Sequence, residues 1–318
     1  MSREQHFILS DPERKTFLAL MDAFADADFY GSTNAVARDL KPAIEEILPK
    51  EIVSAVQGMK LGTGPELIAI QNLPVDDILP SNESLKERVQ AKTRMSELCL
   101  VGINALLEGS FQEEKSSHQR GYIHQVTPVK DFVTEASGRG GGAIPFHAEN
   151  MFIKDCPSCL SLFCLQGEAG VETEYLYVSD ILKRLSHEVL EQLKRPVYTV
   201  TSGDGFARKT LNNTPILDEL ENGWVACRLY EEDRIFSEDL KTQEAIAALH
   251  QSIIDARDAD LCSIELQAGT LLLLSNAVRK QRYGGLLHGR RGDMSVKNVG
   301  LRQNNRWLQR VCIQLSYQ

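Results

Sequence analysis

The sequence predicts an α+β fold in which a helical N-terminal part precedes a core of many short strands. Helical spacing of apolar residues dominates roughly the first third of the chain. From Gly121 onward, short apolar or alternating runs separated by turn residues are typical of strands. This order favours a β-sandwich or barrel with inserted helices. We predict a single domain over residues 1–318, with the helical part at about 1–110 and the core at about 120–318.

Three helices are predicted before the core. The first begins near Asp11, because Pro12 suits a first helical turn and Glu13 adds an early acid. The second runs from about Val36 to Ile47 and ends before a proline. The third runs from Asn82 to Leu106, where apolar residues recur on one helical face.

The core is predicted to combine strands with two inserted helices. The helices are expected over Val178–Leu193 and Thr242–Ala256. Short apolar runs predict strands over Tyr122–Val126, Cys159–Leu165, Pro196–Thr201, Trp224–Leu229, Cys262–Leu266, Thr270–Leu274 and Trp307–Leu315.

Composition indicates a globular protein that binds neither nucleic acid nor an anionic membrane. Hydrophobic residues make up 42% of the chain and charged residues 25%, and 44 Asp and Glu outnumber 35 Lys and Arg. The resulting formal charge of -9 disfavours polyanionic partners and is compatible with a cationic small substrate. Seven scattered cysteines and a polar start to the chain favour the reducing cytoplasm.

The pattern His147-Ala148-Glu149 is the sharpest candidate for chemistry. Residues two apart in a strand point to the same face, so His147 and Glu149 can reach one metal ion together. A distant histidine, His288, would complete a two-histidine, one-carboxylate facial triad, which leaves positions open for a redox iron. A zinc hydrolase would use the same three residues, and a non-catalytic jelly-roll binding protein would use none of them.

Further residues bear on a cosubstrate. Arg306 begins the last strand, and its planar guanidinium suits the far carboxylate of a dicarboxylic 2-oxo acid. The glycine cluster Gly138–Gly142 lacks the Lys-Ser/Thr of a phosphate loop and is interpreted as a flexible lid beside the metal strand. The Cys156-Pro157-Ser158-Cys159 pattern has no second CxxC and is interpreted as a pair of incidental thiols.

Several motifs together resemble one family, the clavaminate synthase-like branch of the Fe(II)- and 2-oxoglutarate-dependent oxygenases, related to the taurine dioxygenase superfamily. The resemblance runs from about Asn72 to the C-terminus, and its motifs occur in the family's order. They are Asn72–Asp77 followed by Leu79-Pro80, Tyr122-Ile123-His124 with Thr127-Pro128-Val129, Phe146–Asn150, Leu162–Leu165, Ala268–Leu272, His288-Gly289-Arg290 and Arg306–Arg310. The resemblance implies a double-stranded β-helix (jelly-roll) core with flanking and inserted helices.

The resemblance also assigns roles to individual residues. The implied iron ligands are His147, Glu149 and His288. Arg306 is implied to bind the distal carboxylate of 2-oxoglutarate, with Arg310 nearby and Thr173 as a hydrogen-bonding partner. The stretch between His288 and Arg306 is longer than is usual in the family, so Arg302 competes for the arginine role. Because Glu149 fills the position that a halide would take, hydroxylation is favoured over halogenation.

The substrate implied by the resemblance is an amino acid. This branch includes hydroxylases of free arginine, lysine and asparagine, and a cationic side chain would be received by the acidic stretch Arg228–Asp233, through Glu232 or Asp233. Gln119 corresponds to a substrate-contacting glutamine. We therefore expect Fe(II), 2-oxoglutarate and O₂ to hydroxylate an unactivated C–H bond, with free lysine or arginine favoured. The alternatives are a carrier-tethered or other small substrate, and desaturation or cyclisation by the same centre.

Overall fold

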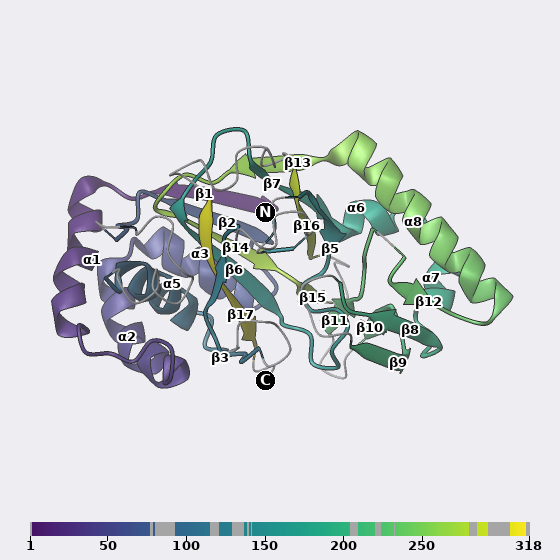
Figure 1. The fold of residues 1–318 in the computed structure, drawn as a ribbon, viewed down its shortest axis with the longest axis horizontal. Coiled ribbons are helices and arrows are strands. Elements are labelled where there is room, and N and C mark those ends of the chain that lie inside the picture. The colour runs from purple at the N-terminus through teal and green to yellow at the C-terminus, as the bar shows by residue number, and fades with distance from the viewer. Residues whose placement is uncertain are drawn as a thin grey trace.

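The computed structural model describes residues 2–76, 79, 93–114, 121–128, 137–138, 140, 142–203, 209–219, 224–231, 233–279, 285–291 and 306–315. Figure 1 shows the N-terminal helices at one end of the molecule, two sheets in the middle and the long helix α8 (Leu240–Asp260) at the other end. The candidate metal residues lie on the strands in the middle.

The larger sheet has seven strands in the order β1-β2-β14-β6-β17-β3, with β4 also paired to β17. Its strands are β1 (Glu4–Ile8), β2 (Leu67–Gln71), β14 (Thr270–Ser275), β6 (Cys159–Gln166), β17 (Trp307–Gln314), β3 (Ser110–Phe111) and β4 (His124–Val126). β1 and β2 pair in parallel, and β14, β6 and β17 pair antiparallel. β1 and β2 come from the part expected to be helical, so the sequence interpretation missed two short strands that extend the core sheet.

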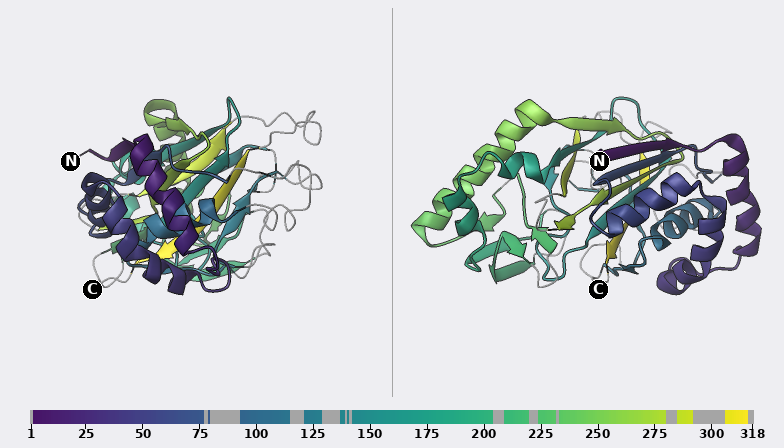
Figure 2. Two further views of the ribbon diagram at one scale, coloured as in Figure 1. Left: turned by 90° about the vertical axis from the view of Figure 1, so that its left-hand side faces the viewer. Right: turned by 180° about the vertical axis from the view of Figure 1, so that it is seen from behind.

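Four helices cover the outer face of the larger sheet, as the two views of Figure 2 show. They are α1 (Asp11–Ala23), α2 (Thr33–Ile47), α3 (Lys50–Lys60) and α5 (Met95–Ala105). The pleat of β14 decides which side chains meet them. Leu271 and Leu273 pack in the cluster that contains the helices, whereas Leu272 and Leu274 face the other way.

The smaller sheet packs against the inner face of the larger one and has the order β13-β7-β16-β5. Its strands are β13 (Cys262–Glu265), β7 (Glu172–Tyr177), β16 (Leu286–Arg291) and β5 (Ile144–His147). Tyr175, Tyr177 and Leu286 join Leu272 and Leu274 in one buried cluster between the sheets. Side chains on alternate positions of these strands therefore point into a shared interior, and this interior holds the candidate site.

The outer face of the smaller sheet is covered by a third layer. Leu176 and Leu287 pack there with residues of helices and two three-stranded sheets. These elements are α6 (Val178–Leu182), α7 (His187–Leu193), α8, β8 (Tyr198–Thr201), β9 (Thr210–Thr214), β10 (Leu217–Glu219), β11 (Trp224–Cys227), β12 (Ile235–Phe236) and β15 (Ala277–Arg279). Among the described residues, no helix combines the length and apolar character needed to cross a bilayer.

The predicted helix over Val178–Leu193 is wrong as a single element. It forms α6 and α7, because Ser186 begins a new helix and its hydroxyl accepts a hydrogen bond from the Val189 N–H at 3.3 Å. The helix predicted over Thr242–Ala256 is confirmed and is longer at both ends. All seven predicted core strands are confirmed, with some of their ends shifted.

Of the helix predicted over Asn82–Leu106, residues 82–92 lie outside the described residues. Thr93 and Arg94 are not helical, and α5 begins at Met95. The carboxylate of Asp76 accepts a hydrogen bond from the Ser96 N–H at 3.3 Å, so an acid from a distant segment satisfies a donor in the first turn. Periodicity alone does not show such a cap, because the capping residue is not adjacent in sequence.

Candidate metal centre

The structure brings together the three predicted metal ligands. One potential ligand atom from each of His147, Glu149 and His288 lies within 4.8 Å of the other two. His147 ends β5, and His288 is its direct partner on the antiparallel strand β16, so the imidazole centroids are 4.3 Å apart. Glu149 lies just beyond the end of β5 and is 2% exposed as a side chain. The cluster therefore lies between the sheets, with Glu149 buried and the two histidines partly buried.

The donor atoms of this cluster fit a divalent metal ion. Glu149 Oε2 and His288 Nε2 are 3.4 Å apart, and neither has a hydrogen-bond partner among the described residues. His147 Nδ1 lies 2.8 Å from the Pro145 carbonyl oxygen. A carbonyl only accepts hydrogen bonds, so Nδ1 carries the proton and Nε2 keeps the lone pair that a metal needs.

Burial and nearby charges favour the protonation states of His147 and Glu149 that can bind a metal ion. Burial, together with the neighbouring His288, lowers the pKa of His147 to about 4, so its imidazole is neutral near neutral pH. Burial alone would raise the pKa of Glu149, but the Arg310 guanidinium and His288 outweigh it and hold that pKa well below its usual range. The neutral His147 imidazole and the Glu149 carboxylate, together with His288, form the donor set of a facial triad.

Asn276 fixes the backbone of Glu149, and the sequence interpretation did not identify it. Its side-chain oxygen accepts a hydrogen bond from the Glu149 N–H at 2.8 Å, and its amide nitrogen donates to the Glu149 carbonyl at 3.1 Å. The same nitrogen donates to the Pro157 carbonyl at 2.8 Å. Asn276 follows β14 directly, so the larger sheet positions a ligand that follows a strand of the smaller sheet.

The acidic stretch predicted to contact the substrate lies along the other edge of β5. The Ala148 N–H donates to the Leu229 carbonyl at 2.9 Å, and Tyr230 pairs with His147 as an isolated bridge. The Tyr230 ring centroid is 5.7 Å from that of His147. Glu231 is occupied by the scaffold, because its carboxylate accepts from the Phe146 N–H at 3.0 Å and pairs with a helix α8 arginine.

Arg310 lies against the metal cluster. Its guanidinium donates to Glu149 Oε1 at 2.9 Å and to His124 Nδ1 at 2.9 Å. Arginine has no acceptor, so His124 carries its proton on Nε2, which lies 3.1 Å from the Gly121 carbonyl oxygen. Burial and the positive charge of Arg310 lower the pKa of His124 to about 4. The neutral imidazole of His124 therefore orients Arg310.

Arg306 and Thr173, predicted to bind the cosubstrate, also lie together. Both are buried, and Arg306 Nη2 donates to Thr173 Oγ1 at 2.6 Å. Arg290 is a second buried guanidinium beside them, because it is the direct partner of Thr173 on the neighbouring strand. Nε of each arginine lacks a hydrogen-bond partner among the described residues. Burial and the positive charge of Arg306 lower the pKa of Arg290 to about 10. An anion bound here would therefore be stabilised by two buried positive charges.

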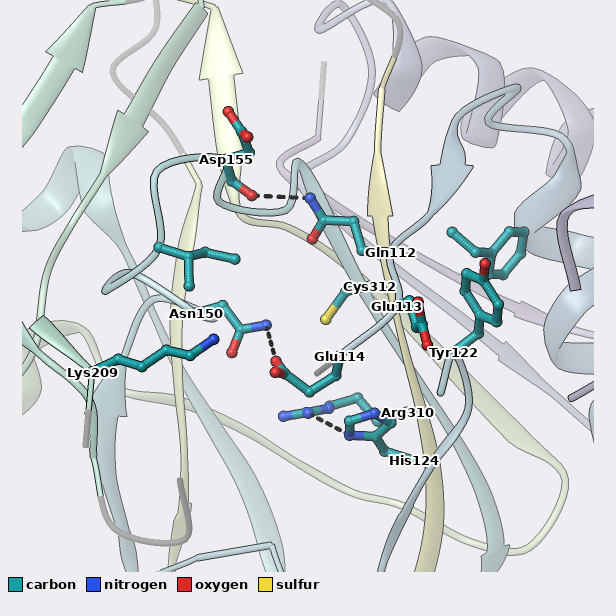
Figure 3. A pocket seen from close by; sticks show the side chains of 12 residues that line it. Gln112, Glu113, Glu114, Tyr122, His124, Asn150, Asp155, Lys209, Arg310 and Cys312 are labelled. Atoms are coloured by element: carbon teal, nitrogen blue, oxygen red, sulfur yellow. Dashed lines mark hydrogen bonds between the residues drawn. The ribbon is translucent and has the colours of Figure 1, made fainter. Parts of the chain in front are cut away.

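A pocket of about 450 Å³ adjoins the metal cluster through Arg310 and Asn150 (Figure 3). Figure 3 shows Glu114 in the middle of this pocket, where it accepts a hydrogen bond from Asn150 at 3.3 Å. Lys209 extends into the pocket from the opposite wall, and Asp155 lies at its edge. The pocket therefore offers several charged groups next to the candidate metal centre.

Other predicted residues are not placed at the centre. Gln119, Glu232 and the competing Arg302 lie outside the described residues. The Asp233 side chain is 94% exposed and lies 3.8 Å from His250 on α8, so the structure places it at the surface. Of the glycine cluster, Gly138, Gly140 and Gly142 are described, and the predicted lid function stays a prediction.

The structure also accounts for the cysteines. All seven are unpaired, so Cys156 and Cys159 form no disulfide. Cys156 instead accepts a hydrogen bond from Arg228 at 2.8 Å, and Cys159 is buried in the core. Arg228 also donates to the carbonyls of Met151 and Ile153, which organises the turn after Glu149. The interpretation of the CxxC pattern as incidental thiols stays a prediction.

Comparison with known proteins gives relatives of one chemical type. No family model matches the chain. The L-lysine 3-hydroxylase of Catenulispora acidiphila is 24% identical over 276 residues, covering 85% of this chain and 75% of the relative. An asparagine oxygenase solved with Fe(II), a 3-hydroxyasparagine and succinate has a TM-score of 0.78 at 19% identity, covering 98% of this chain and 93% of that one.

A second solved structure agrees with the first. The non-heme iron oxygenase OrfP, in complex with Fe, succinate and (3S)-hydroxy-L-Arg, has a TM-score of 0.78 at 20% identity, covering 98% of this chain and 95% of that one. The resemblance expected from the motifs is thereby confirmed. The chain has the fold of these non-heme iron amino-acid oxygenases.

Proposed function

We propose that the protein is an Fe(II)- and 2-oxoglutarate-dependent oxygenase that hydroxylates an unactivated C–H bond of a free amino acid, with lysine or arginine as substrate. The observation that carries the proposal is the cluster of His147, Glu149 and His288, in which Glu149 Oε2 and His288 Nε2 have no hydrogen-bond partner among the described residues. The fold shared with iron oxygenases and the sequence similarity to a lysine hydroxylase support it.

The proposed metal ligands are His147 Nε2, a Glu149 carboxylate oxygen and His288 Nε2. When bound, Fe(II) and 2-oxoglutarate supply the activation of O₂ and the oxidation of the C–H bond, with succinate and CO₂ as the cosubstrate products. The residues of the chain position the metal ligands and exclude water from the site. Pro145 and Asn276 fix the orientations of two ligands, and the buried setting between the sheets keeps water from the site.

Arg306 and Thr173 are proposed to hold the distal carboxylate of 2-oxoglutarate. The guanidinium offers paired donors that match a carboxylate, and the buried setting strengthens the interaction. Arg310 is proposed to lie on the side of the cosubstrate that faces the metal, because it contacts Glu149. This arrangement favours the oxygenase over a zinc hydrolase, which needs no cosubstrate and therefore no site for the distal carboxylate of a 2-oxo acid.

The pocket of Figure 3 supports a cationic amino acid as the substrate. Glu114 lies in its middle, and Glu113 and Asp155 also line it, so a substrate that carries ammonium or guanidinium groups meets complementary charge. Gln119 and Glu232 stay proposed substrate contacts, whereas the exposed side chain of Asp233 does not support that role. A carrier-tethered substrate, or desaturation or cyclisation by the same centre, is the alternative that the substrate test below separates.

We also propose a jelly-roll core within one domain. The two facing sheets, with the triad in the interior between them, support a double-stranded β-helix (jelly-roll) core. β1 and β2 of the N-terminal part pair into the larger sheet, which supports one domain over residues 1–318. Seven unpaired cysteines support the reducing cytoplasm as the location.

The proposal is tested by succinate formation under air with Fe(II), 2-oxoglutarate and ascorbate, across a panel of common amino acids. We expect lysine or arginine to stimulate succinate formation and to gain the mass of one oxygen atom. His147→Ala should abolish both signals, whereas His187→Ala, an exposed histidine on α7, should change neither. Activity that persists with zinc and without O₂ would instead support the hydrolase. No succinate from the folded, iron-loaded protein would end the oxygenase proposal.

A further inference from the structure

Arg290 is a buried arginine to which neither the sequence motifs nor the metal cluster assign a role. It lies on β16, and only 4% of the residue is exposed. One terminal nitrogen donates to the Gly140 carbonyl at 2.9 Å and also to the Gly142 carbonyl, so the side chain holds the backbone that leads into β5. These two bonds use one of its three nitrogens, and Nε has no partner among the described residues.

The location of Arg290 follows from strand register. Arg290 and Thr173 are direct partners on β16 and β7, so their side chains lie on the same face of the smaller sheet. Arg306 reaches this face from the start of β17 and donates to Thr173. Arg290 and Arg306 therefore lie on the same interior face beside Thr173, near enough for the charge of Arg306 to act on Arg290.

Two buried cations at one place need compensating negative charge. The carboxylate of Glu168 interacts electrostatically with both Arg290 and Arg306. Burial lowers the pKa of both arginines, and the positive charge of Arg306 lowers that of Arg290 further. Among the described residues, Glu168 is the carboxylate that acts on this pair, and one negative charge balances only one of the two positive charges. A buried charge without a partner costs a large free energy, so a second anion at this place would be bound strongly.

We propose that Arg290 is a second cationic residue of the cosubstrate pocket, which binds the distal carboxylate of 2-oxoglutarate together with Arg306. The proposal rests on the proposed function, because it takes the cosubstrate to be a dicarboxylic 2-oxo acid. Through its bonds to Gly140 and Gly142, Arg290 also links this carboxylate to the backbone that precedes the metal strand. A purely structural arginine would hold the glycine carbonyls and contribute nothing to the choice of 2-oxo acid.

The test compares two 2-oxo acids that differ only at the far end. In 2-oxopentanoate, a methyl group replaces the distal carboxylate of 2-oxoglutarate, while the end that chelates the metal is the same. Binding of each acid is measured by calorimetry in the Zn(II)-loaded protein without substrate, so the readout does not depend on turnover. Wild type, Arg290→Gln, Arg290→Lys and the positive control Arg306→Gln are compared after circular dichroism has shown that each is folded.

We expect Arg290→Gln to weaken 2-oxoglutarate binding about 10- to 100-fold, the range of one charge-assisted hydrogen bond, and to leave 2-oxopentanoate binding within about 2-fold. Arg290→Lys keeps the charge and should retain part of the preference for 2-oxoglutarate. Equal weakening of both acids, or of neither, in Arg290→Gln would overturn the proposal and leave Arg290 a structural tether, and so would an Arg290→Lys variant that has lost the preference as completely as Arg290→Gln. If wild type itself fails to prefer 2-oxoglutarate, the proposed function fails first, so the two failures are distinguishable.

Discussion

Asn276→Asp should weaken metal binding although residue 276 is not a ligand. The substitution keeps the shape of the side chain, and one oxygen can still accept the hydrogen bond from the Glu149 N–H. The other oxygen replaces the amide nitrogen that donates to the carbonyls of Glu149 and Pro157 at 3.1 and 2.8 Å. Two buried carbonyls then lose their donor and face an oxygen atom instead.

The magnitude follows from these two bonds. Leaving a buried polar group without its partner costs about 1–3 kcal/mol, so two such groups should lower the free energy of unfolding by about 3–4 kcal/mol. The Glu149 backbone is then free to shift from the position that serves the metal. Loss of a residue that orients a ligand typically lowers metal affinity about 10- to 100-fold. We expect this loss for Co(II) or Zn(II), measured by competition with a chromogenic chelator.

Asn104→Asp provides the matched control. Asn104 is also buried, and its amide nitrogen donates to the Leu100 carbonyl at 2.7 Å within α5, away from the metal cluster. This variant should lose stability in urea unfolding and keep the metal affinity of wild type. Equal metal affinities for Asn276→Asp and Asn104→Asp would refute the reasoning. They would show that the hydrogen bonds between the Asn276 side chain and the Glu149 backbone do not position the ligand.

Three further predictions concern the cosubstrate, pH and backbone geometry. Thr173→Val removes the hydroxyl that accepts a hydrogen bond from Arg306. The KM for 2-oxoglutarate should therefore rise about 10-fold while kcat stays nearly unchanged. An unchanged KM would contradict the proposed role of Thr173. The pKa of His124 is about 4 when folded and near 6.5 when unfolded, so the unfolded chain binds more protons between these values. Between about pH 6 and 4.5, the unfolding free energy of the metal-free wild type should therefore fall about 1.4 kcal/mol per pH unit more steeply than that of His124→Asn, and equal slopes would count against the assignment. Gly269 has φ of 80°, and an added Cβ would lie 2.3 Å from the Leu73 carbonyl oxygen, so Gly269→Ala should cost at least about 2 kcal/mol in urea unfolding; a loss under about 1 kcal/mol would show that the backbone adapts.

The metal triad was predictable because its strongest signal is local. His147 and Glu149 are two residues apart, and this spacing alone suggests that both reach one ion. The structure adds that Glu149 lies beyond the end of β5. The hydrogen bond from its N–H to the Asn276 side chain, and not a continuing strand, therefore orients Glu149. The assignment of His288 needed the resemblance, since histidines far apart in sequence carry no distance information.

The substrate contacts were less predictable. Glu232 or Asp233 was expected to face the substrate. Glu232 lies outside the described residues, Asp233 lies at the surface, and the neighbouring Glu231 accepts a hydrogen bond from the Phe146 N–H. Glu114, in contrast, carried no signal in the sequence and lies in the middle of the pocket. A carboxylate's role depends on which backbone donors and cations lie nearby, and these neighbours come from other strands and loops.

The sequence by itself determined the succession of helices and strands, the acidic balance and the residues with metal-binding chemistry, because periodicity, charge and side-chain type are local properties. The tertiary structure alone decided which distant residues meet. Strand register sets His288 opposite His147 and Arg290 opposite Thr173, and sheet packing brings Arg306 and Arg310 to the same interior. Register is a cooperative result of the whole hydrophobic pattern, since a slip by one residue would turn each of these side chains to the other face of its sheet.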